Sequence, residues 1–399
     1  MRMRFVTSFL LAAGLAVPAV AQLALPRVPL PTGPIGRTLD TVTGAVEPVL
    51  ADAGRQLASL RVARIDRLVR TNSKALELAR DGYPARRGEV LVLGASSIAE
   101  SAISTVGFVK LGNETVEGLD LTVTHYRLPA GMKMRDVGPL IERVAPGLEW
   151  SPDHVYEQAG RAPALVDAKG ERPISARVGV IDGAAAASIG LAASKGFATG
   201  APVASNHGSA VVSLLKQAGV RTVAVADVYG TDPAGGSATA VARGLGWLVA
   251  GGAKVVTVSL VGPDNTLLRR AVAAAQAKGT VIVAAVGNDG PAAPPAYPAS
   301  YPGVVGVTGV DGRNRALIEA GRALNLDYAA PGADITGSDA KGRQVKLRGT
   351  SFAAPLAAAR IAAGIGGDWR RSADAETVDL GRKGPDPVYG RGLLCGKCR

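Results

Sequence analysis

Hydrophobic residues in the second half of the chain gather into short continuous runs and do not alternate with polar residues. Ala-rich stretches of helical character separate most of these runs, which lie at residues 178–181, 223–228, 255–260, 281–286 and 304–307. Strands that are buried on both faces have this pattern, and they alternate with helices in parallel sheets. The pattern predicts an α/β domain whose mostly parallel sheet carries helices on both faces. Ligands in such sheets bind at the carboxyl ends of the strands, so a functional site is expected among the residues that follow these runs.

The residues before 177 divide into a helical segment and a smaller mixed unit. Between residues 49 and 80, apolar residues recur every three or four positions among arginines. This spacing predicts a basic amphipathic helix that docks on the next domain, is solvated, or lies on a membrane. Further on, the pattern predicts strands at 90–93, 119–128 and 148–156 and helices at 97–111 and 134–144. This order predicts a small α+β module of ferredoxin-like type.

The two ends of the sequence carry signals of their own. Two arginines within residues 1–4, an apolar run of roughly a dozen residues and Ala19-Val20-Ala21 predict a cleaved export signal, with an uncleaved anchor as the alternative. No later run is long enough for a membrane span, so we expect a periplasmic or extracellular protein without one. The only cysteines, Cys395 and Cys398, predict a local disulfide in the tail or an intermolecular bridge.

Composition narrows the classes of function. Hydrophobic residues make up 47% of the chain and charged residues 20%, which is typical of a folded protein with a large core. The net charge of +12 is spread along the chain without a basic block, so we expect no nucleic-acid partner. The three histidines are His125, His154 and His207, too few for a Cys/His zinc cluster.

Four polar residues stand where the predicted strands end or the helices begin. Asp182 follows the first buried run, and Asn288 follows the fourth. His207 opens one apolar helix, and Ser351 opens another that is rich in alanine and contains Pro355 in what we expect to be its first turn. Taken singly, an Asp after a strand or a His at a helix start is usually structural. Free N–H groups at a helix N-terminus, however, suit a developing oxyanion beside Ser351.

Together these positions resemble the motifs of the subtilisin-like serine peptidases, whose triad runs Asp, His, Ser along the chain. Val-Ile-Asp182-Gly, His207-Gly-Ser and Gly-Thr-Ser351-Phe-Ala-Ala-Pro resemble the three triad motifs, and Val-Gly-Asn288 matches the asparagine motif. One departure is Gly183, because the family usually has Ser or Thr directly after the aspartate. The resemblance covers about residues 177–394.

The resemblance implies a role for each residue. Ser351 would attack a peptide carbonyl, His207 would act as the base, and Asp182 would orient the imidazole. Asn288 and the Ser351 N–H would bind the oxyanion, with no cofactor required. The segment that would pair with a polypeptide substrate is Ser259, Leu260 and Val261, and the pocket residues would be Ala285, Val286, Gly287 and Ala296. Because these are small or apolar, we expect a modest apolar side chain before the cleaved bond, and Val261, where the family has Gly, would narrow the groove.

The resemblance also bears on organisation and on rival functions. We expect an export signal (1–21), a linker and basic helix (22–87), a propeptide-like module (88–160), a peptidase domain (172–394) and a CxxC tail (395–399). The module would be an intramolecular inhibitor cut off between about 158 and 175, or else a permanent domain. The short segment 216–221 argues against calcium there and leaves other calcium sites open. The main alternative function is a weak or inactive peptide-binding relative; an unrelated α/β hydrolase is disfavoured because no serine stands in Gly-x-Ser-x-Gly.

Overall fold

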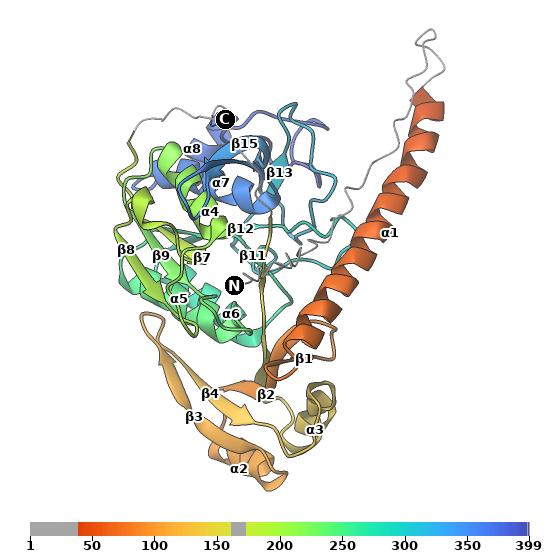
Figure 1. Cartoon of the computed structure of the whole chain (residues 1–399), viewed down its shortest axis with the longest axis vertical. Coiled ribbons are helices and arrows are strands. Elements are labelled where there is room, and N and C mark those ends of the chain that lie inside the picture. The colour runs from red at the N-terminus through yellow and green to blue at the C-terminus, as the bar shows by residue number, and fades with distance from the viewer. Residues whose placement is uncertain (1–38, 161–172, 397, 399) are drawn as a thin grey trace, which may run out of the picture. The chain divides into compact units, whose positions relative to one another are not determined.

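Short runs of valine and alanine form a parallel sheet, as the pattern predicts (Figure 1). The structure is a computed structural model that describes residues 39–160, 173–396 and 398, with side chains from residue 52 onward. The seven strands are β7 (Val178–Asp182), β8 (Ala193–Gly196), β9 (Val223–Asp227), β10 (Val255–Val258), β12 (Val281–Ala285), β13 (Val305–Val310) and β14 (Tyr328–Pro331). Their order is β14-β13-β12-β10-β7-β9-β8, and all neighbours are parallel, which confirms the predicted fold class.

Helices cover both faces of this sheet because successive strand residues point to opposite sides. Val178 and Val180 of β7 pack on one face with α4 (Asn206–Gln217) and α7 (Thr350–Ala363). Ile181 packs on the other face with α5 (Ala238–Ala250) and α6 (Thr266–Ala277). The helix α8 (Trp369–Glu376) and the hairpin β15 (Ala333–Ser338) and β16 (Gln344–Arg348) complete the domain. The site residues at the ends of these elements therefore rest on a fully buried framework.

The small module has its own antiparallel sheet. Its elements are β1 (Leu76–Leu78), β2 (Pro84–Leu93), α2 (Ser97–Thr105), β3 (Val109–Val116), β4 (Leu121–Arg127), a 3-10 turn η1 (Met134–Asp136), α3 (Val137–Val144) and β5 (Glu149–His154). The predicted helix 97–111 is wrong beyond Thr105, where Gly107 turns the chain at φ +95° and β3 begins. The module's Leu91, Leu93 and Val123 pack against α5 and α6.

The long helix that precedes the module is α1 (Leu39–Thr71). It ends nine residues before the expected position, because Leu76 is buried in the pairing of β1 with β2. Module structure thus begins before residue 88, where we had expected the boundary. The chain forms two units, residues 1–49 and residues 50–399, and all the contacts described below lie in the second. The predicted export signal and most of the expected cleavage interval lie outside the described residues.

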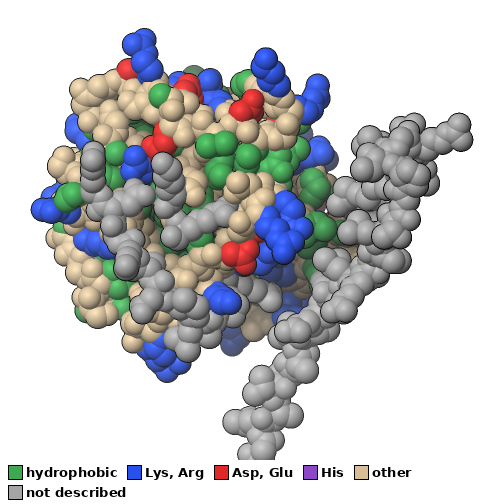
Figure 2. Space-filling model, turned by 90° about the horizontal axis from the view of Figure 1, so that it is seen from above, with side chains coloured by type: hydrophobic (Ala, Val, Ile, Leu, Met, Phe, Trp, Pro, Cys, Tyr) green, Lys and Arg blue, Asp and Glu red, His purple; other side chains and the backbone are tan. Residues whose placement is uncertain are grey.

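Four further observations concern the tail, the surface, membrane spans and metal sites. Cys395 and Cys398 form a disulfide with each other, which confirms the local bridge. Lys and Arg side chains are distributed around the face seen in Figure 2, with acidic side chains among them. Among the helices that the structure describes, none is long and apolar enough to cross a membrane. Residues 39–160, 173–396 and 398 contain no cluster of three His, Cys, Asp or Glu side chains arranged for a metal ion.

Candidate active site

Asp182, His207 and Ser351 meet at the carboxyl end of β7. Asp182 is the last residue of that strand, His207 lies in the first turn of α4, and Ser351 lies in the first turn of α7. The Nδ1 atom of His207 is 2.8 Å from Oδ2 of Asp182, and its Nε2 atom is 3.0 Å from Oγ of Ser351. All three side chains are buried. Three residues that were predicted from separate motifs are therefore joined by two hydrogen bonds.

The Asp182 carboxylate is fixed from both sides. Its Oδ1 accepts hydrogen bonds from the backbone N–H of Gly183 at 2.7 Å and from Nε2 of Gln158 at 2.9 Å. Its Oδ2 is left to face His207, and an ionised carboxylate can only accept. The imidazole therefore carries its proton on Nδ1, and Nε2 is free to accept the Ser351 hydroxyl proton.

Gly183 and Gly208 allow the histidine helix to approach the aspartate strand. A Cβ on Gly208 would lie 2.0 Å from the carbonyl oxygen of Gly183, and a Cβ on Gly183 would lie 2.4 Å from Oγ of Ser205. Ser205 is the N-cap of α4, where its hydroxyl accepts the Gly208 N–H at 2.9 Å. The Ser205 hydroxyl thus fills the space that a side chain after Asp182 would need, which explains the departure at Gly183.

Pro355 has a different role from the one that we predicted. It is the sixth residue of α7, beyond the first turn, so its missing N–H leaves the Ser351 carbonyl without a helical partner. The Ser259 hydroxyl donates to that carbonyl at 2.8 Å. Ser259, which we expected only in substrate binding, therefore also holds the backbone of Ser351 in place.

Asn288 lies just beyond β12 and beside the start of α7. Its Oδ1 accepts the backbone N–H of Thr350 at 3.0 Å, which fixes the orientation of the amide. The Thr350 hydroxyl in turn bonds the backbone N–H of Gly287 at 3.1 Å. Asn288 Nδ2 is buried and has no hydrogen-bond partner among the described residues. A buried donor without a partner is costly, which favours a functional explanation for this amide.

The groove beside the three residues is occupied by the chain itself. The strand β6 (Glu157–Gln158) pairs antiparallel with β11 (Leu260–Val261), so Val261 does not prevent a peptide from pairing there. The backbone N–H of Ala159 donates to the carbonyl of Ser259 at 3.1 Å, and the carbonyl of Ala159 accepts the Ser351 N–H at 3.0 Å. The residue after it is equally close, because a Cβ on Gly160 would lie 2.2 Å from Ser351 Oγ.

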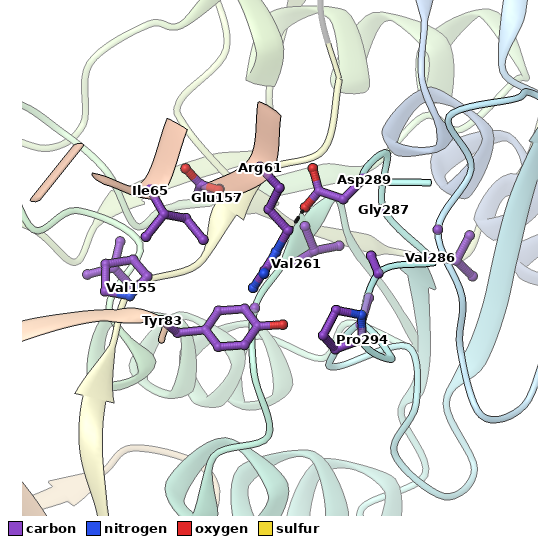
Figure 3. A pocket seen from close by; sticks show the side chains of 15 residues that line it. Arg61, Ile65, Tyr83, Val155, Glu157, Val261, Val286, Gly287, Asp289 and Pro294 are labelled. Atoms are coloured by element: carbon purple, nitrogen blue, oxygen red, sulfur yellow. Dashed lines mark ion pairs between the residues drawn. The ribbon is translucent and has the colours of Figure 1, made fainter. Parts of the chain in front are cut away.

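A pocket opens beside this strand, and Figure 3 shows the side chains around it. Four of the predicted residues line it: Val261, Val286, Gly287 and Ala296. Ala285 and Leu260 do not, because both are buried in the core. Two acidic residues outside the predicted set, Glu157 and Asp289, also line the pocket. We did not predict Gln158, Ala159 or Arg61 from the sequence, because their positions depend on contacts between distant segments.

Comparison with known proteins places this geometry in a family. Residues 192–366 match the Subtilase family (Peptidase_S8). The chain is 32% identical to Subtilisin DY of Bacillus licheniformis over 217 residues, which cover 49% of this chain and 79% of that protein. The chain belongs to the subtilase family.

Other subtilases resemble the chain over shorter spans. Thermitase of Thermoactinomyces vulgaris is 34% identical over 158 residues, which cover 39% of this chain and 54% of that protein. The minor extracellular protease Epr of Bacillus subtilis (strain 168) is 30% identical over 199 residues, which cover 48% of this chain but only 30% of that protein. The chain thus spans about half the length of thermitase and less than a third of that of Epr.

A solved structure shares the fold. It is fervidolysin from Fervidobacterium pennivorans, described as a keratinolytic enzyme related to subtilisin. The TM-score is 0.65 and the sequence identity 17%, over 82% of this chain and 63% of fervidolysin. The predicted subtilisin-like fold is therefore confirmed.

Proposed function

We propose that this subtilase is a serine endopeptidase that hydrolyses peptide bonds through an acyl-enzyme. The observation that carries the proposal is the imidazole of His207, which is within hydrogen-bond distance of both Asp182 and Ser351. His207 Nε2 takes the proton of Ser351 Oγ while Oγ attacks the carbonyl carbon. The C–N bond then breaks as His207 returns that proton to the leaving amine. A water molecule, activated by the same base, hydrolyses the ester and regenerates Ser351.

The oxyanion of each tetrahedral intermediate needs donors that are already in place. We assign this role to the backbone N–H of Ser351 and to Nδ2 of Asn288. The amide of Asn288 is held by Thr350 and keeps its buried Nδ2 without a partner among the described residues. The Ser351 N–H already binds a carbonyl in this structure, that of Ala159.

Ala159–Gly160 is our proposed site of self-cleavage, and the module before it is the proposed intramolecular inhibitor. The Ala159 carbonyl accepts a hydrogen bond from the Ser351 N–H, one of the two proposed oxyanion donors. The strand β6, directly before Ala159, pairs with β11 in the groove. The bond lies within the interval, between about 158 and 175, in which we expected a cut. A peptide held in this way blocks the groove for other substrates until it leaves.

Contacts beyond the groove support an inhibitory module. The buried carboxylate of Asp153 accepts the backbone N–H of Thr239 at 3.0 Å, at the positive end of α5. Asn265, the N-cap of α6, donates to the carbonyl of Pro152 at 2.9 Å. Arg86 pairs with both Asp153 and Asp232. The module is thus attached to two helix starts of the peptidase domain as well as to the groove.

Intact mass with and without a fluorophosphonate probe tests the proposed function. We expect the purified full chain to yield a species that begins at Gly160 and takes up one probe molecule, while Ser351→Ala stays uncut and unlabelled. If the wild-type chain takes up no probe, even after limited proteolysis removes the residues before 160, the chain is an inactive peptide-binding subtilase.

We further propose export to the periplasm or the medium, which the extracellular relative Epr supports.

The stability of the module is expected to fall as pH rises. His125 Nε2 lies 3.4 Å from Glu114, which also pairs with Arg243 of α5 at 2.8 Å. Pairing with Glu114 raises the pKa of His125, with the nearby Asp153 and Glu89 adding to the effect and burial opposing it. The pair with His125 lowers the pKa of Glu114 although burial opposes this, so Glu114 remains charged. A raised histidine pKa adds stability below about pH 6.5 that is lost as pH rises through the raised value.

We therefore expect the thermal midpoint of the uncut Ser351→Ala chain to fall between about pH 6 and 8. The loss should correspond to less than about 1 kcal/mol, because both side chains are partly exposed. His125→Gln in the same background should flatten this part of the curve. An unchanged slope in that variant would assign the pH dependence to other groups.

A further inference from the structure

The helix α1 places an arginine into the pocket beside the groove. Figure 3 shows the Arg61 side chain between Asp289 and the ring of Tyr83. Its Nε atom lies 3.5 Å from Oδ2 of Asp289, and its guanidinium carbon lies 4.4 Å from the centre of the Tyr83 ring. Only 14% of the side chain is exposed. A charge this far removed from water needs partners, and Asp289 and the Tyr83 ring supply them.

Arg64, one turn further along α1, pairs with Asp289 and also with Glu157 of the strand in the groove. Its Nη2 atom is 2.9 Å from Glu157 Oε2 and 3.0 Å from Asp289 Oδ1. Burial alone would lower the pKa of Arg64, but Glu157 and Asp289 raise it above its usual value. The guanidinium therefore stays charged and links α1, the groove strand and the rim of the pocket.

Apolar contacts place the same face of α1 on the peptidase domain. Leu57 packs so closely on Gly290 that a Cβ there would lie 2.9 Å from Leu57 Cδ1, and Gly290 has φ +82°. Ile65 is buried and lines the pocket. Leu57, Arg64 and Ile65 are each three or four positions from Arg61, so the four residues share one face of the helix. That face contacts Asp289 and Gly290, directly after Asn288.

The pocket is available to Arg61 because the groove strand does not fill it. Ala159, the residue before the proposed cut, has only a methyl side chain, whereas the lining residues Gly287 and Ala296 leave room for a larger one. With Arg61 in place, the remaining cavity has a volume of about 30 Å³. The long arginine side chain thus occupies space that a substrate side chain would otherwise enter.

We propose that α1 is a second inhibitory segment, which closes the substrate pocket in addition to the strand at residues 157–159. The inference rests on the proposed peptidase function. Cutting the Ala159–Gly160 bond breaks the covalent link between the strand and the peptidase domain but leaves the contacts of Arg61 and Arg64 unchanged. The cut chain therefore stays inhibited until the face of α1 is released or degraded. Arg61 Nη2 is buried and lacks a hydrogen-bond partner among the described residues, which limits the strength of this contact and allows release.

The delay between the cut and the appearance of active sites tests the inference. In the purified full chain, intact mass follows the cut at Ala159–Gly160, and fluorophosphonate uptake counts open sites. We expect open sites to lag behind the cut in the wild type, and Arg61→Ala/Arg64→Ala to shorten the lag about tenfold, as loss of a desolvated charge pair speeds dissociation. The matched control is Arg67→Ala/Arg70→Ala, which removes two exposed arginines from the same helix and should keep the wild-type lag.

A second readout does not depend on activity. After the cut, the fragment that ends at Ala159 should co-elute with the chain from Gly160 onward, and the double variant at 61 and 64 should lose this co-elution sooner. If that variant does not fold, Asp289→Asn removes the carboxylate facing both arginines from the other side and should shorten the lag as well. Simultaneous cut and labelling in the wild type, or equal lags in all variants, would overturn the inference. Both results would leave the proposed function intact, because that function fails only when no chain is cut or labelled.

Discussion

His207→Ala is expected to slow self-cleavage at Ala159–Gly160 by about 10⁶-fold, the scale found for triad residues in subtilisin itself. The imidazole is the only group within hydrogen-bond distance of both Ser351 Oγ and Asp182 in the part of the chain that the structure describes. Without it, the serine hydroxyl has no base to take its proton during attack, and the leaving amine has no acid. Intact mass of the purified full chain over hours to days measures the rate of the cut.

His125→Gln is the matched control for this experiment. His125 lies in β4 of the small module and contacts Glu114, so its loss removes an imidazole without changing the proposed base. We expect this variant to cut itself within a few-fold of the wild-type rate. Rapid cutting by the His207→Ala chain, at the same bond, would show that another group activates Ser351 and would end the proposed mechanism.

Most strands of the central sheet could be predicted because each carries its signal, a run of apolar residues, within its own sequence. Runs such as residues 255–260 are buried on both faces, and their continuous valines indicate strands without reference to the rest of the chain. β3 was not predicted as a strand, because its first five residues are exposed and do not form an apolar run. β8 is a short edge strand with the sequence Ala-Ser-Lys-Gly, and it too lacks a hydrophobic signal.

The three residues of the proposed triad were predictable for a different reason. Each member stands in a motif that has a recognisable neighbourhood, and the family resemblance joined the motifs before any distance was known. The occupant of the groove had no such motif. Glu157 and Gln158 form a strand only because β11, about a hundred residues later, offers its edge. Such a pairing is set by the tertiary fold and leaves no local pattern.

The contact of Arg61 with Asp289 could not be predicted from the sequence either. The local sequence does not distinguish Arg61 from Arg67 or Arg70, since all three belong to a series of arginines that recur every three positions on the basic helix. Only the rotation of α1, set by contacts such as Leu57 with Gly290, decides which arginine reaches Asp289. The prediction for Pro355 was wrong by less than one turn. We expected the proline in the first turn of the helix, but it is the sixth residue of α7.

Asn288→Ala is expected to slow self-cleavage by about 10² to 10³-fold, the range measured for the corresponding donor of subtilisin. In this structure the amide has two tasks, because Oδ1 accepts the Thr350 N–H while Nδ2 remains buried without a partner in the described residues. Alanine removes both, so a slow cut alone would not separate loss of an oxyanion donor from a disturbed start of α7.

Asn288→Asp separates the two tasks. Aspartate has nearly the same shape and keeps an oxygen that can accept the Thr350 N–H, but it has no N–H to donate to a developing oxyanion. We expect it to be at least as slow as Asn288→Ala, because a second negative charge beside the oxyanion adds repulsion to the lost hydrogen bond. The rate of the cut, measured by intact mass, and the thermal midpoint of each chain provide the comparison. If Asn288→Asp cuts itself at the wild-type rate while Asn288→Ala is slow, Asn288 acts by positioning Thr350 and Ser351, and the oxyanion must be bound by the Ser351 N–H and another donor.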